Sequence, residues 1–281
     1  MTTFSVVIPC LNGARTLGRQ LEAISSSSGP ELIEILVADN GSTDGTASLI
    51  AEFHERDSRI QRVDASRARG INVARNRGSR AATGDFLLFV DADDWVSTEW
   101  FEAIQARVDD DVSLLGGGVE RVDVDGEVIA VDVGGYQMLW DRPWPIGANC
   151  GVRRSVLIQL GMFDESFQGG GDETEFFWRA SLAGYSLVTI PEAIVKYQLR
   201  TSARAVFKQH MAYGRSHVRL FVRFSEHGMP RPPVWRAAGA AAVGLLGCLS
   251  PRRTVRLKSA GRLGTYLGRA AESLRLRVFY V

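Results

Sequence analysis

The sequence is poor in cysteine, lacks a basic leader at its start and contains no long apolar run. Its three cysteines are odd in number and far apart, which fits neither a disulfide framework nor a metal site, so a reducing cytoplasm is expected. The segment 1–8 is too short for a secretory signal peptide and lacks its basic residues. No apolar stretch approaches the ~20 residues that a membrane-spanning helix needs.

An excess of one charge is also missing. The chain carries 33 Lys and Arg against 32 Asp and Glu, a balance that argues against nucleic acid as a general partner. The basic residues nevertheless crowd toward the C-terminus. With 281 residues, 45% of them apolar, the chain can form one large domain or two small ones around a sizeable core.

The N-terminal half alternates between short apolar strands and amphipathic helices. Strands are expected at 4–8, 32–38, 60–63 and 86–90, and helices at 14–27, 46–56 and 67–82, with Ser42 or Thr43 capping the second helix. This alternation predicts a parallel sheet joined by right-handed crossovers. The first turn lacks the Gly-Xaa-Gly-Xaa-Xaa-Gly phosphate cradle, which disfavours a dinucleotide cofactor.

The apolar run 86–90 ends abruptly in three carboxylates, Asp91, Asp93 and Asp94. Ligands of open α/β sheets bind outside the carboxyl ends of the strands, and carboxylate oxygens suit Mg²⁺ or Mn²⁺ carrying a phosphorylated substrate. Taken alone, the segment could equally be an acidic loop that keeps a strand end soluble. Further polar groups follow two other strands, at Pro9 to Asn12 and at Asp39.

These segments, in this order and at these intervals, resemble the family 2 glycosyltransferases of GT-A fold. The resemblance covers at least residues 4–200, and the segments that carry it are 6–12, 37–46, 74–78 and 84–94. It implies an α/β fold of the Rossmann-like GT-A type, with a mostly parallel central sheet flanked by helices. Residues 1–115 would be its nucleotide-binding half and residues 116–200 its acceptor and catalytic half.

The resemblance also assigns roles in binding the donor. It implies that Asp39 hydrogen-bonds the base, and that Arg75 and the loop of Pro9 and Asn12 line the nucleotide pocket. The chemistry agrees, because a carboxylate accepts from a pyrimidine imide N–H and a guanidinium suits a diphosphate. The alternatives are a turn-stabilising role for Asp39 and a solvated helix face for Arg75.

The resemblance also implies roles in binding the donor substrate for the acids that follow strand 86–90. Asp91 would hold the ribose and Asp93 would ligate Mg²⁺ or Mn²⁺. Asn149, in the segment Gly147–Asn149, is similar to a family segment that lies beside the donor sugar. The nearby Trp140 and Trp144 could stack on a sugar ring or simply pack in the core.

A triple-glycine loop, Gly169–Gly171, precedes two adjacent acids, Asp172 and Glu173, at the start of a predicted helix. The positive end of a helix favours an ionised carboxylate, which suits a general base. The similar family motif has Glu-Asp here, so the inverted pair leaves open which acid is the base. Glu175 and Arg179, four residues apart, are expected to form a stabilising pair on one helix face.

One departure from the family pattern concerns the metal. Relatives often carry a His where this chain has Lys196, and a charged lysine cannot ligate a metal. Lys196 would either neutralise the diphosphate or lie on the surface. His210 and His217, seven residues apart, are expected to be helix-face residues rather than replacement ligands.

Residues 201–281 are expected to form a helical, basic and amphipathic C-terminal region. A helix is predicted over 203–224 and an apolar run of 13 residues over 237–249, which is too short to span a bilayer. Alternating arginines and leucines in 252–277 predict attraction to anionic lipid. The alternative is a packed tail or a solvated helix in a dimer.

The sequence therefore predicts a metal-dependent, inverting glycosyltransferase of the hexosyltransferase type. It would move a sugar from a nucleoside-diphosphate sugar to a hydroxyl of a cell-envelope or lipid-linked glycan, and it would be cytoplasmic, held peripherally at the inner face of the plasma membrane. The alternatives are another GT-A nucleotidyl or retaining sugar transferase and a catalytically silent sugar-nucleotide-binding scaffold.

Overall fold

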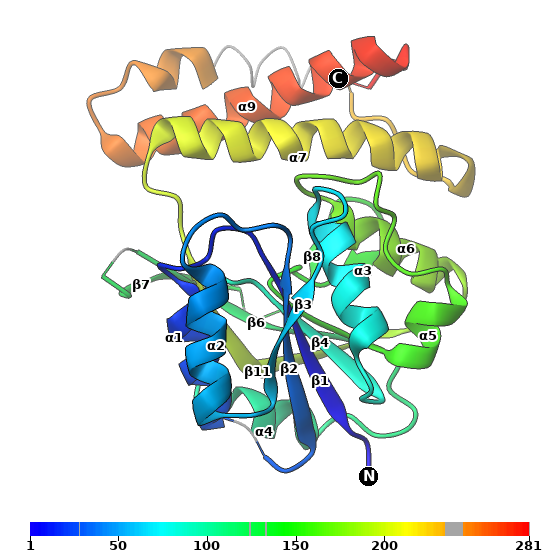
Figure 1. Ribbon diagram of the computed structural model, residues 1–281. Helices are drawn as coiled ribbons and strands as arrows, with labels where there is room; N and C mark the ends of the chain where they lie inside the picture. The colour runs from blue at the N-terminus through cyan, green and yellow to red at the C-terminus, as the bar shows by residue number, and fades with distance from the viewer. Residues whose placement is uncertain (28, 124, 133, 234–243, 281) are drawn as a thin grey trace. The chain divides into compact units, whose positions relative to one another are not determined.

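The computed structural model describes residues 1–27, 29–123, 125–132, 134–233 and 244–280 (Figure 1). The chain divides into two compact units. The sheet unit consists of Met1–Glu165 and Glu173–Leu199, and the helical unit consists of Ser166–Asp172 and Arg200–Val281.

A mainly parallel sheet forms the centre of the sheet unit (Figure 1). Its path runs β3-β2-β1-β4-β10-β6-β11-β5, and β7 pairs with β6 at the side. The strands are β1 (Phe4–Cys10), β2 (Leu32–Asp39), β3 (Ile60–Asp64), β4 (Phe86–Val90), β5 (Trp95–Val96), β6 (Leu114–Val122), β7 (Val128–Asp132), β10 (Asn149–Arg153) and β11 (Leu187–Gln198). β8 (Gln137–Met138) and β9 (Pro143–Trp144) form a separate pair.

The first four strands are parallel, as the alternation predicts, whereas β10 runs antiparallel to both β4 and β6. All five residues of β4 are buried, because neighbouring strands flank it on both sides and helices cover the sheet. Uninterrupted apolar strands of this kind are typical of parallel sheets that are covered on both faces. The helices of this unit are α1 (Leu17–Ser27), α2 (Thr46–Arg56), α3 (Ile71–Ala81), α4 (Trp100–Gln105), α5 (Arg154–Gln159) and α6 (Asp172–Leu182), which begins on the last residue of the helical unit.

Two expectations about helix starts are wrong. The first turn of α2 is satisfied by Asp44, whose carboxylate accepts from the backbone N–H of Thr46, and not by Ser42 or Thr43. The hydroxyl of Ser42 instead accepts from the N–H of Asn12, so it joins two loops. The third helix begins at Ile71 rather than near residue 67, because Gly70 before it has φ 145°, a backbone conformation outside any helix.

In the helical unit, α7 (Ala203–Phe224) and α9 (Arg253–Leu276) pack closely through glycines (Figure 1). A Cβ on Gly214 would lie 2.0 Å from the carbonyl oxygen of Thr265, and one on Gly268 would lie 2.1 Å from that of Met211. Side chains there would force the two backbones apart. One face of α9 is therefore packed, as the packed-tail alternative expects.

Polar groups also join the two helices. The carboxylate of Glu272 accepts from Arg219 at 2.7 Å, and both Arg219 and Arg275 help to lower its pKa against the opposing effect of burial. His217 contacts Arg269, and burial first and that cation second lower the pKa of His217 to about 3. His210 and His217 are thus helix-face residues, as predicted.

Much of the predicted apolar run 237–249 lies outside the described residues, and only 244–248 of it are seen as helical. In the part of the chain that the structure describes, no helix combines the length and the apolar character needed to cross a membrane.

Candidate active site

The parallel pairing brings the polar strand ends together at one edge of the sheet. Cys10 at the end of β1 lies in register with Asp39 at the end of β2, and β1 also pairs with β4, which leads into Asp91. The loops after these strands are joined as well. The side-chain oxygen of Asn12 accepts from the N–H of Thr43 at 2.9 Å, and the positive φ of Asn12, 56°, turns the chain there.

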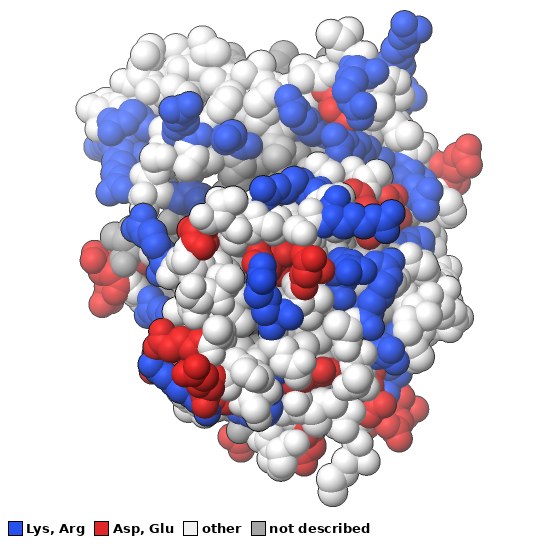
Figure 2. All heavy atoms as spheres, in the orientation of Figure 1, with Lys and Arg blue, Asp and Glu red and all other residues white. Residues whose placement is uncertain are grey.

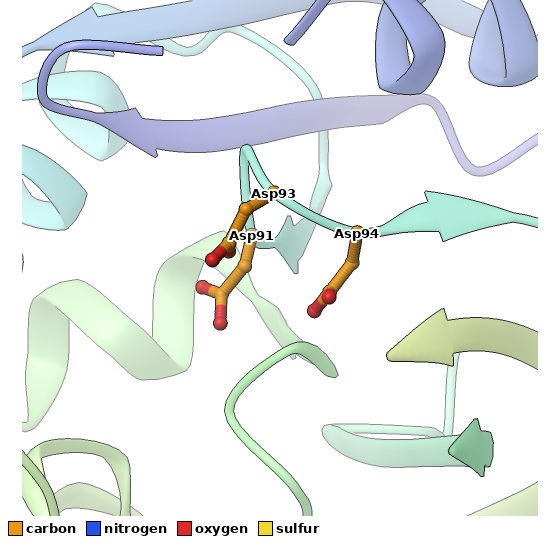
Figure 3. Close-up of side chains that lie close together, drawn as sticks. All are labelled: Asp91, Asp93 and Asp94. Atoms are coloured by element: carbon orange, nitrogen blue, oxygen red, sulfur yellow. The ribbon is translucent and has the colours of Figure 1, made fainter. Parts of the chain in front are cut away.

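The acidic loop after β4 concentrates three carboxylates (Figure 3). Oxygens of Asp91, Asp93 and Asp94 all lie within 4.8 Å of one another, and Figure 3 shows the three side chains directed to the same side of the loop. Asp94 is buried and accepts from the backbone N–H of Gln198 at 3.0 Å, which ties the loop to the end of β11. Gln20 holds the other side by donating to the carbonyl of Asp91.

This donor set fits a hard divalent cation. Mg²⁺ and Mn²⁺ prefer carboxylate oxygens, and Mg²⁺ is usually bound through one or two of them together with water and substrate phosphates. Asp91 and Asp93 are both half-buried, so each keeps access to solvent, whereas Asp94 is 2% exposed and already bound to the backbone. Asp91 and Asp93 can therefore supply one or two metal ligands, and Asp94 holds in place the loop that carries them.

Asp39 is held in place from two sides. One oxygen accepts from the N–H of Ser42 at 2.8 Å, and the other accepts from the guanidinium of Arg62 at 2.9 Å. Burial alone would raise the pKa of Asp39, but these hydrogen bonds outweigh it and lower the pKa. The carboxylate therefore stays ionised near neutral pH. It is 0% exposed, and its bond to Ser42 is the turn-stabilising one that the alternative expects.

Arg62 is part of the candidate site, but the sequence alone does not indicate it. It lies in β3, and only the register of that strand, with Arg62 beside Val37, brings its side chain to Asp39. Nothing in the local sequence distinguishes it from other strand arginines.

Cys10, the last residue of β1, lies beside these acids. Burial first, and then the charge of Asp39, raise the pKa of its thiol to about 12. A thiol that stays protonated is a poor nucleophile. The side chain is 3% exposed and serves as a small packing residue, as the sequence suggests.

Arg75 does not lie on a solvated helix face, and that alternative is wrong. Its side chain is 1% exposed and donates to Asn72 and to the carbonyl of Gly147, both at 3.3 Å. Its guanidinium also lies 5.6 Å from the centre of the Phe163 ring. Because the guanidinium is buried this deeply, its charge acts on the groups that pack directly against it rather than on solvent.

Asn149 forms a core network. Its amide oxygen accepts from the indole N–H of Trp100 at 3.0 Å, and its amide nitrogen donates to the carbonyls of Gly118 and Ala193 at 2.8 and 2.7 Å. Both amide hydrogens are thus committed to the β6 and β11 backbones. The residue is 1% exposed, so its observed contacts are structural.

The two candidate stacking tryptophans pack with a third. Trp140 and Trp144 each meet the ring of Trp178 edge to face, with centroids 5.5 and 5.4 Å apart. Trp144 is 8% exposed. The contacts therefore match the packing alternative for both residues.

The predicted base region combines a constrained loop with a helix start. Gly169, Gly170 and Gly171 all have positive φ, of 81°, 121° and 64°, and the carboxylate of Asp172 accepts from the N–H of Gly170 at 2.8 Å. The Asp172 side chain is therefore used to shape its own loop. Glu173 follows it in the sheet unit, beside Gly147.

Further along α6, the predicted pair of Glu175 and Arg179 is confirmed. Two hydrogen bonds of 3.0 and 2.9 Å join them, and Glu175 is fully buried. Arg179 also donates to the carbonyl of Met162, so the pair anchors α6 to the loop after α5. Lys196 lies on β11 in register with Trp95, two residues after Asp93.

The chain is similar in sequence to known glycosyltransferases. A model of the family described as glycosyl transferase family 2 matches residues 5–161. Glycosyltransferase AglE of Haloferax volcanii is 28% identical over 244 residues, which make up 84% of this chain and 80% of that protein. The Escherichia coli protein named UDP-Glc:alpha-D-GlcNAc-diphosphoundecaprenol beta-1,3-glucosyltransferase WfgD is 26% identical over 204 residues, 71% of this chain and 78% of that protein.

Solved structures share the fold. Mannosyltransferase PcManGT from Pyrobaculum calidifontis, solved in complex with GDP-Man and Mn²⁺, superposes with a TM-score of 0.67 at 20% identity and covers 97% of this chain and 87% of its own. The mixed α/β arrangement with a mainly parallel sheet and a helical C-terminal region is thereby confirmed as that of the GT-A proteins.

Proposed function

Because the chain belongs to glycosyl transferase family 2 and is a glycosyltransferase, we propose that it is a metal-dependent, inverting enzyme that uses a nucleoside-diphosphate sugar. The observation that carries this proposal is the cluster of Asp91, Asp93 and Asp94 at the sheet edge, next to the ends of β1 and β2. A diphosphate leaving group and a divalent cation both suit such an edge.

The donor nucleotide would bind along the ends of β1 and β2. Ionised Asp39 accepts a hydrogen bond from an N–H of the base, while Arg62 fixes the orientation of that carboxylate. The end of β1 at Pro9 and the following loop at Asn12 form the adjoining wall, and the hydrogen bonds of Asn12 to the loop after β2 keep the two walls together. Asp91 would hold the ribose.

Asp93 would hold Mg²⁺ or Mn²⁺ with the donor phosphates and water. When bound, the cation would act as a Lewis acid that neutralises charge on the departing nucleoside diphosphate. The complex of PcManGT with GDP-Man and Mn²⁺ supports this pairing of nucleotide sugar and metal by analogy of fold. Lys196 adds a positive charge on the neighbouring strand, where it would help to neutralise the diphosphate.

Glu173 would act as the general base. It removes the proton of the acceptor hydroxyl as the new bond to C1 of the sugar forms, and the bond from C1 to the phosphate oxygen breaks with its electron pair leaving on the diphosphate. Attack from the face opposite the leaving group inverts the configuration at C1. Asp172 is the other candidate, but its carboxylate is bound within the glycine loop.

A lipid-linked glycan is the proposed acceptor class. The name of the E. coli relative WfgD includes a diphosphoundecaprenol-linked sugar, which supports this choice. We further propose that residues 1–200 are the catalytic domain, and that residues 201–281 hold the enzyme at the cytoplasmic face of a membrane.

The helical unit carries features that suit an anionic surface. Sixteen Lys and Arg against two Asp and Glu lie between residue 200 and the end of the chain, and Figure 2 shows Lys and Arg side chains over α7 and α9 with few acidic ones among them. Leu245, Leu246 and Leu249 are 63%, 73% and 84% exposed, a few residues before the exposed Arg252 and Arg253. Exposed leucines can insert into a lipid surface, while neighbouring arginines are attracted to its anionic headgroups.

Membrane binding is tested with vesicles of phosphatidylglycerol and phosphatidylcholine. The full chain should sediment with anionic vesicles at low salt, and the triple exchange of Leu245, Leu246 and Leu249 to Asp should abolish this. Ile158→Asp is the matched control, because that residue is 53% exposed on α5 of the sheet unit, outside the basic C-terminal region. Protein that stays in the supernatant at low salt would refute the membrane role.

The donor and the metal are tested together by thermal stabilisation. UDP-, GDP- and dTDP-sugars are added with and without Mn²⁺, because a ligand that binds only the folded chain raises its melting temperature. The proposal expects one nucleotide class to stabilise the protein, and to do so more strongly with Mn²⁺. Equal stabilisation with and without the metal would contradict metal dependence.

A further inference from the structure

Gly147 brings two charged groups from distant parts of the sequence to the same point. A Cβ built on this glycine would lie 3.0 Å from Nη2 of Arg75 and 3.1 Å from both Cδ and Oε2 of Glu173. The guanidinium and the carboxylate therefore lie so close to residue 147 that a side chain there would have to push them aside by a few tenths of an ångström. They come from α3 and from the first turn of α6, and the loop before β10 carries the glycine between them.

The guanidinium is fixed where it meets this carboxylate. Arg75 donates to the side chain of Asn72 and to the carbonyl of Gly147, and Phe163 packs on its flank. Asn72 is itself buried and donates to the carbonyl of Asp164 at 2.9 Å. Each contact restricts the rotamer of Arg75, so the position of its charge is defined by the fold.

The charge of Arg75 is buried, so it needs compensation from the groups around it. A cation that is 1% exposed is costly unless an opposite charge and hydrogen bonds compensate it. The Glu173 carboxylate, which lies beside the same point at Gly147, provides that compensation, and the cation in turn favours the ionised carboxylate. A guanidinium also holds a carboxylate in a defined plane, because its donors form a rigid fork.

We infer that Arg75 is a positioning residue for the Glu173 carboxylate, with Gly147 as the gap that lets the two groups meet. The inference rests on the proposed role of Glu173 as general base. It differs from the nucleotide-pocket role that the family resemblance implies for Arg75. Arg75 would keep Glu173 ionised and oriented toward the acceptor hydroxyl, while the Asp39 edge binds the nucleotide.

A double-mutant cycle tests this coupling. Glu173→Gln and Arg75→Met are made singly and together, and kcat and nucleotide affinity are measured for each full-length variant. Glu173→Gln should lower kcat on the order of 10² to 10⁴-fold with nucleotide affinity unchanged. Arg75→Met should lower kcat ~10 to 100-fold, also without changing nucleotide affinity, and should have no further effect in the Glu173→Gln background, because coupled residues are non-additive.

Two conservative variants keep the test usable if Arg75→Met does not fold. Arg75→Lys retains the charge and should recover part of the kcat that Arg75→Met loses. Gly147→Ala leaves both charged residues in place but fills the gap, and it should lower kcat with nucleotide affinity intact. Arg77→Met is the matched control, because Arg77 lies on the exposed side of the same helix, and it should behave as the unchanged enzyme.

The outcomes separate the two claims. Glu173→Gln with full turnover would refute the proposed base, whatever Arg75 does. If Glu173→Gln is impaired but Arg75→Met or Gly147→Ala acts chiefly by weakening nucleotide binding, the positioning role fails and the base assignment stands. A further loss of the same size when Arg75→Met is added to Glu173→Gln would also overturn the positioning role.

Discussion

Replacing Asn149 with Ala separates a structural role from direct contact with the sugar. The family resemblance places this residue beside the donor sugar, whereas the structure commits its amide to three buried partners. These partners are the indole N–H of Trp100 and the carbonyls of Gly118 and Ala193. Alanine would leave all three without the hydrogen bonds that Asn149 supplies.

The size of the effect follows from these contacts. A buried polar group left without its partner costs roughly 1–3 kcal/mol, so three groups together give about 3–9 kcal/mol. Local relaxation and entry of water reduce this sum, and single exchanges above ~5 kcal/mol are rare, so we expect the free energy of unfolding to fall by about 3–5 kcal/mol. That is a large part of the ~5–15 kcal/mol by which a typical protein is stable.

Urea unfolding followed by tryptophan fluorescence measures this loss. Asn149→Ala should shift the midpoint to much lower urea while the slope of the transition stays unchanged. Gln137→Ala, at an exposed position of β8, is the matched control and should leave the midpoint in place. An unchanged midpoint for Asn149→Ala, together with weaker binding of the nucleotide sugar, would refute the structural reasoning.

Three other predictions concern the metal, acid stability and the helical unit. Asp93→Asn should abolish the extra thermal stabilisation that Mn²⁺ gives in the presence of nucleotide, because a neutral amide is a poorer ligand for a hard cation; undiminished stabilisation would exclude Asp93 as a ligand. Because folding lowers the pKa of Asp39, the contribution of this carboxylate to stability is complete above about pH 4 and is lost as the pH falls further. Arg62→Met raises that pKa and should therefore move acid unfolding to higher pH. An unmoved acid transition would contradict the role of this ion pair. Gly268→Ala should destabilise the α7–α9 pair by ~1–3 kcal/mol and Ala270→Ser, on the exposed side of α9, should not; equal melting temperatures for the two variants would show that the close backbone contact is not required.

Much of the sheet and of its edge could be predicted because the signals are local. Apolar runs such as 86–90, with acids directly after them, indicate a buried strand and its ligand-binding end in one segment. The pair of Glu175 and Arg179 was equally predictable, since helix geometry alone places residues four apart on one face. The helix over Ala203–Phe224 has the predicted bounds, because amphipathic periodicity extends over its whole length.

The remaining features depend on contacts between distant segments. Arg62 reaches Asp39 only through the register of β2 and β3, and Arg75 meets Glu173 only because three separate segments converge at Gly147. The helical unit illustrates a different difficulty. Its arginines and leucines suggest a lipid-facing helix, but the close approach of α7 and α9 is set by glycines whose spacing gained meaning only when the partner backbone was known.

The configuration of the newly formed glycosidic bond tests the central claim most directly. A nucleotide sugar of known α configuration is incubated with the enzyme, Mn²⁺ and an acceptor, and the anomeric proton of the first product is assigned by NMR from its coupling constant. The proposed single displacement, with Glu173 as base, predicts a β-linked product. An α-linked product would show retention and would contradict the inverting mechanism.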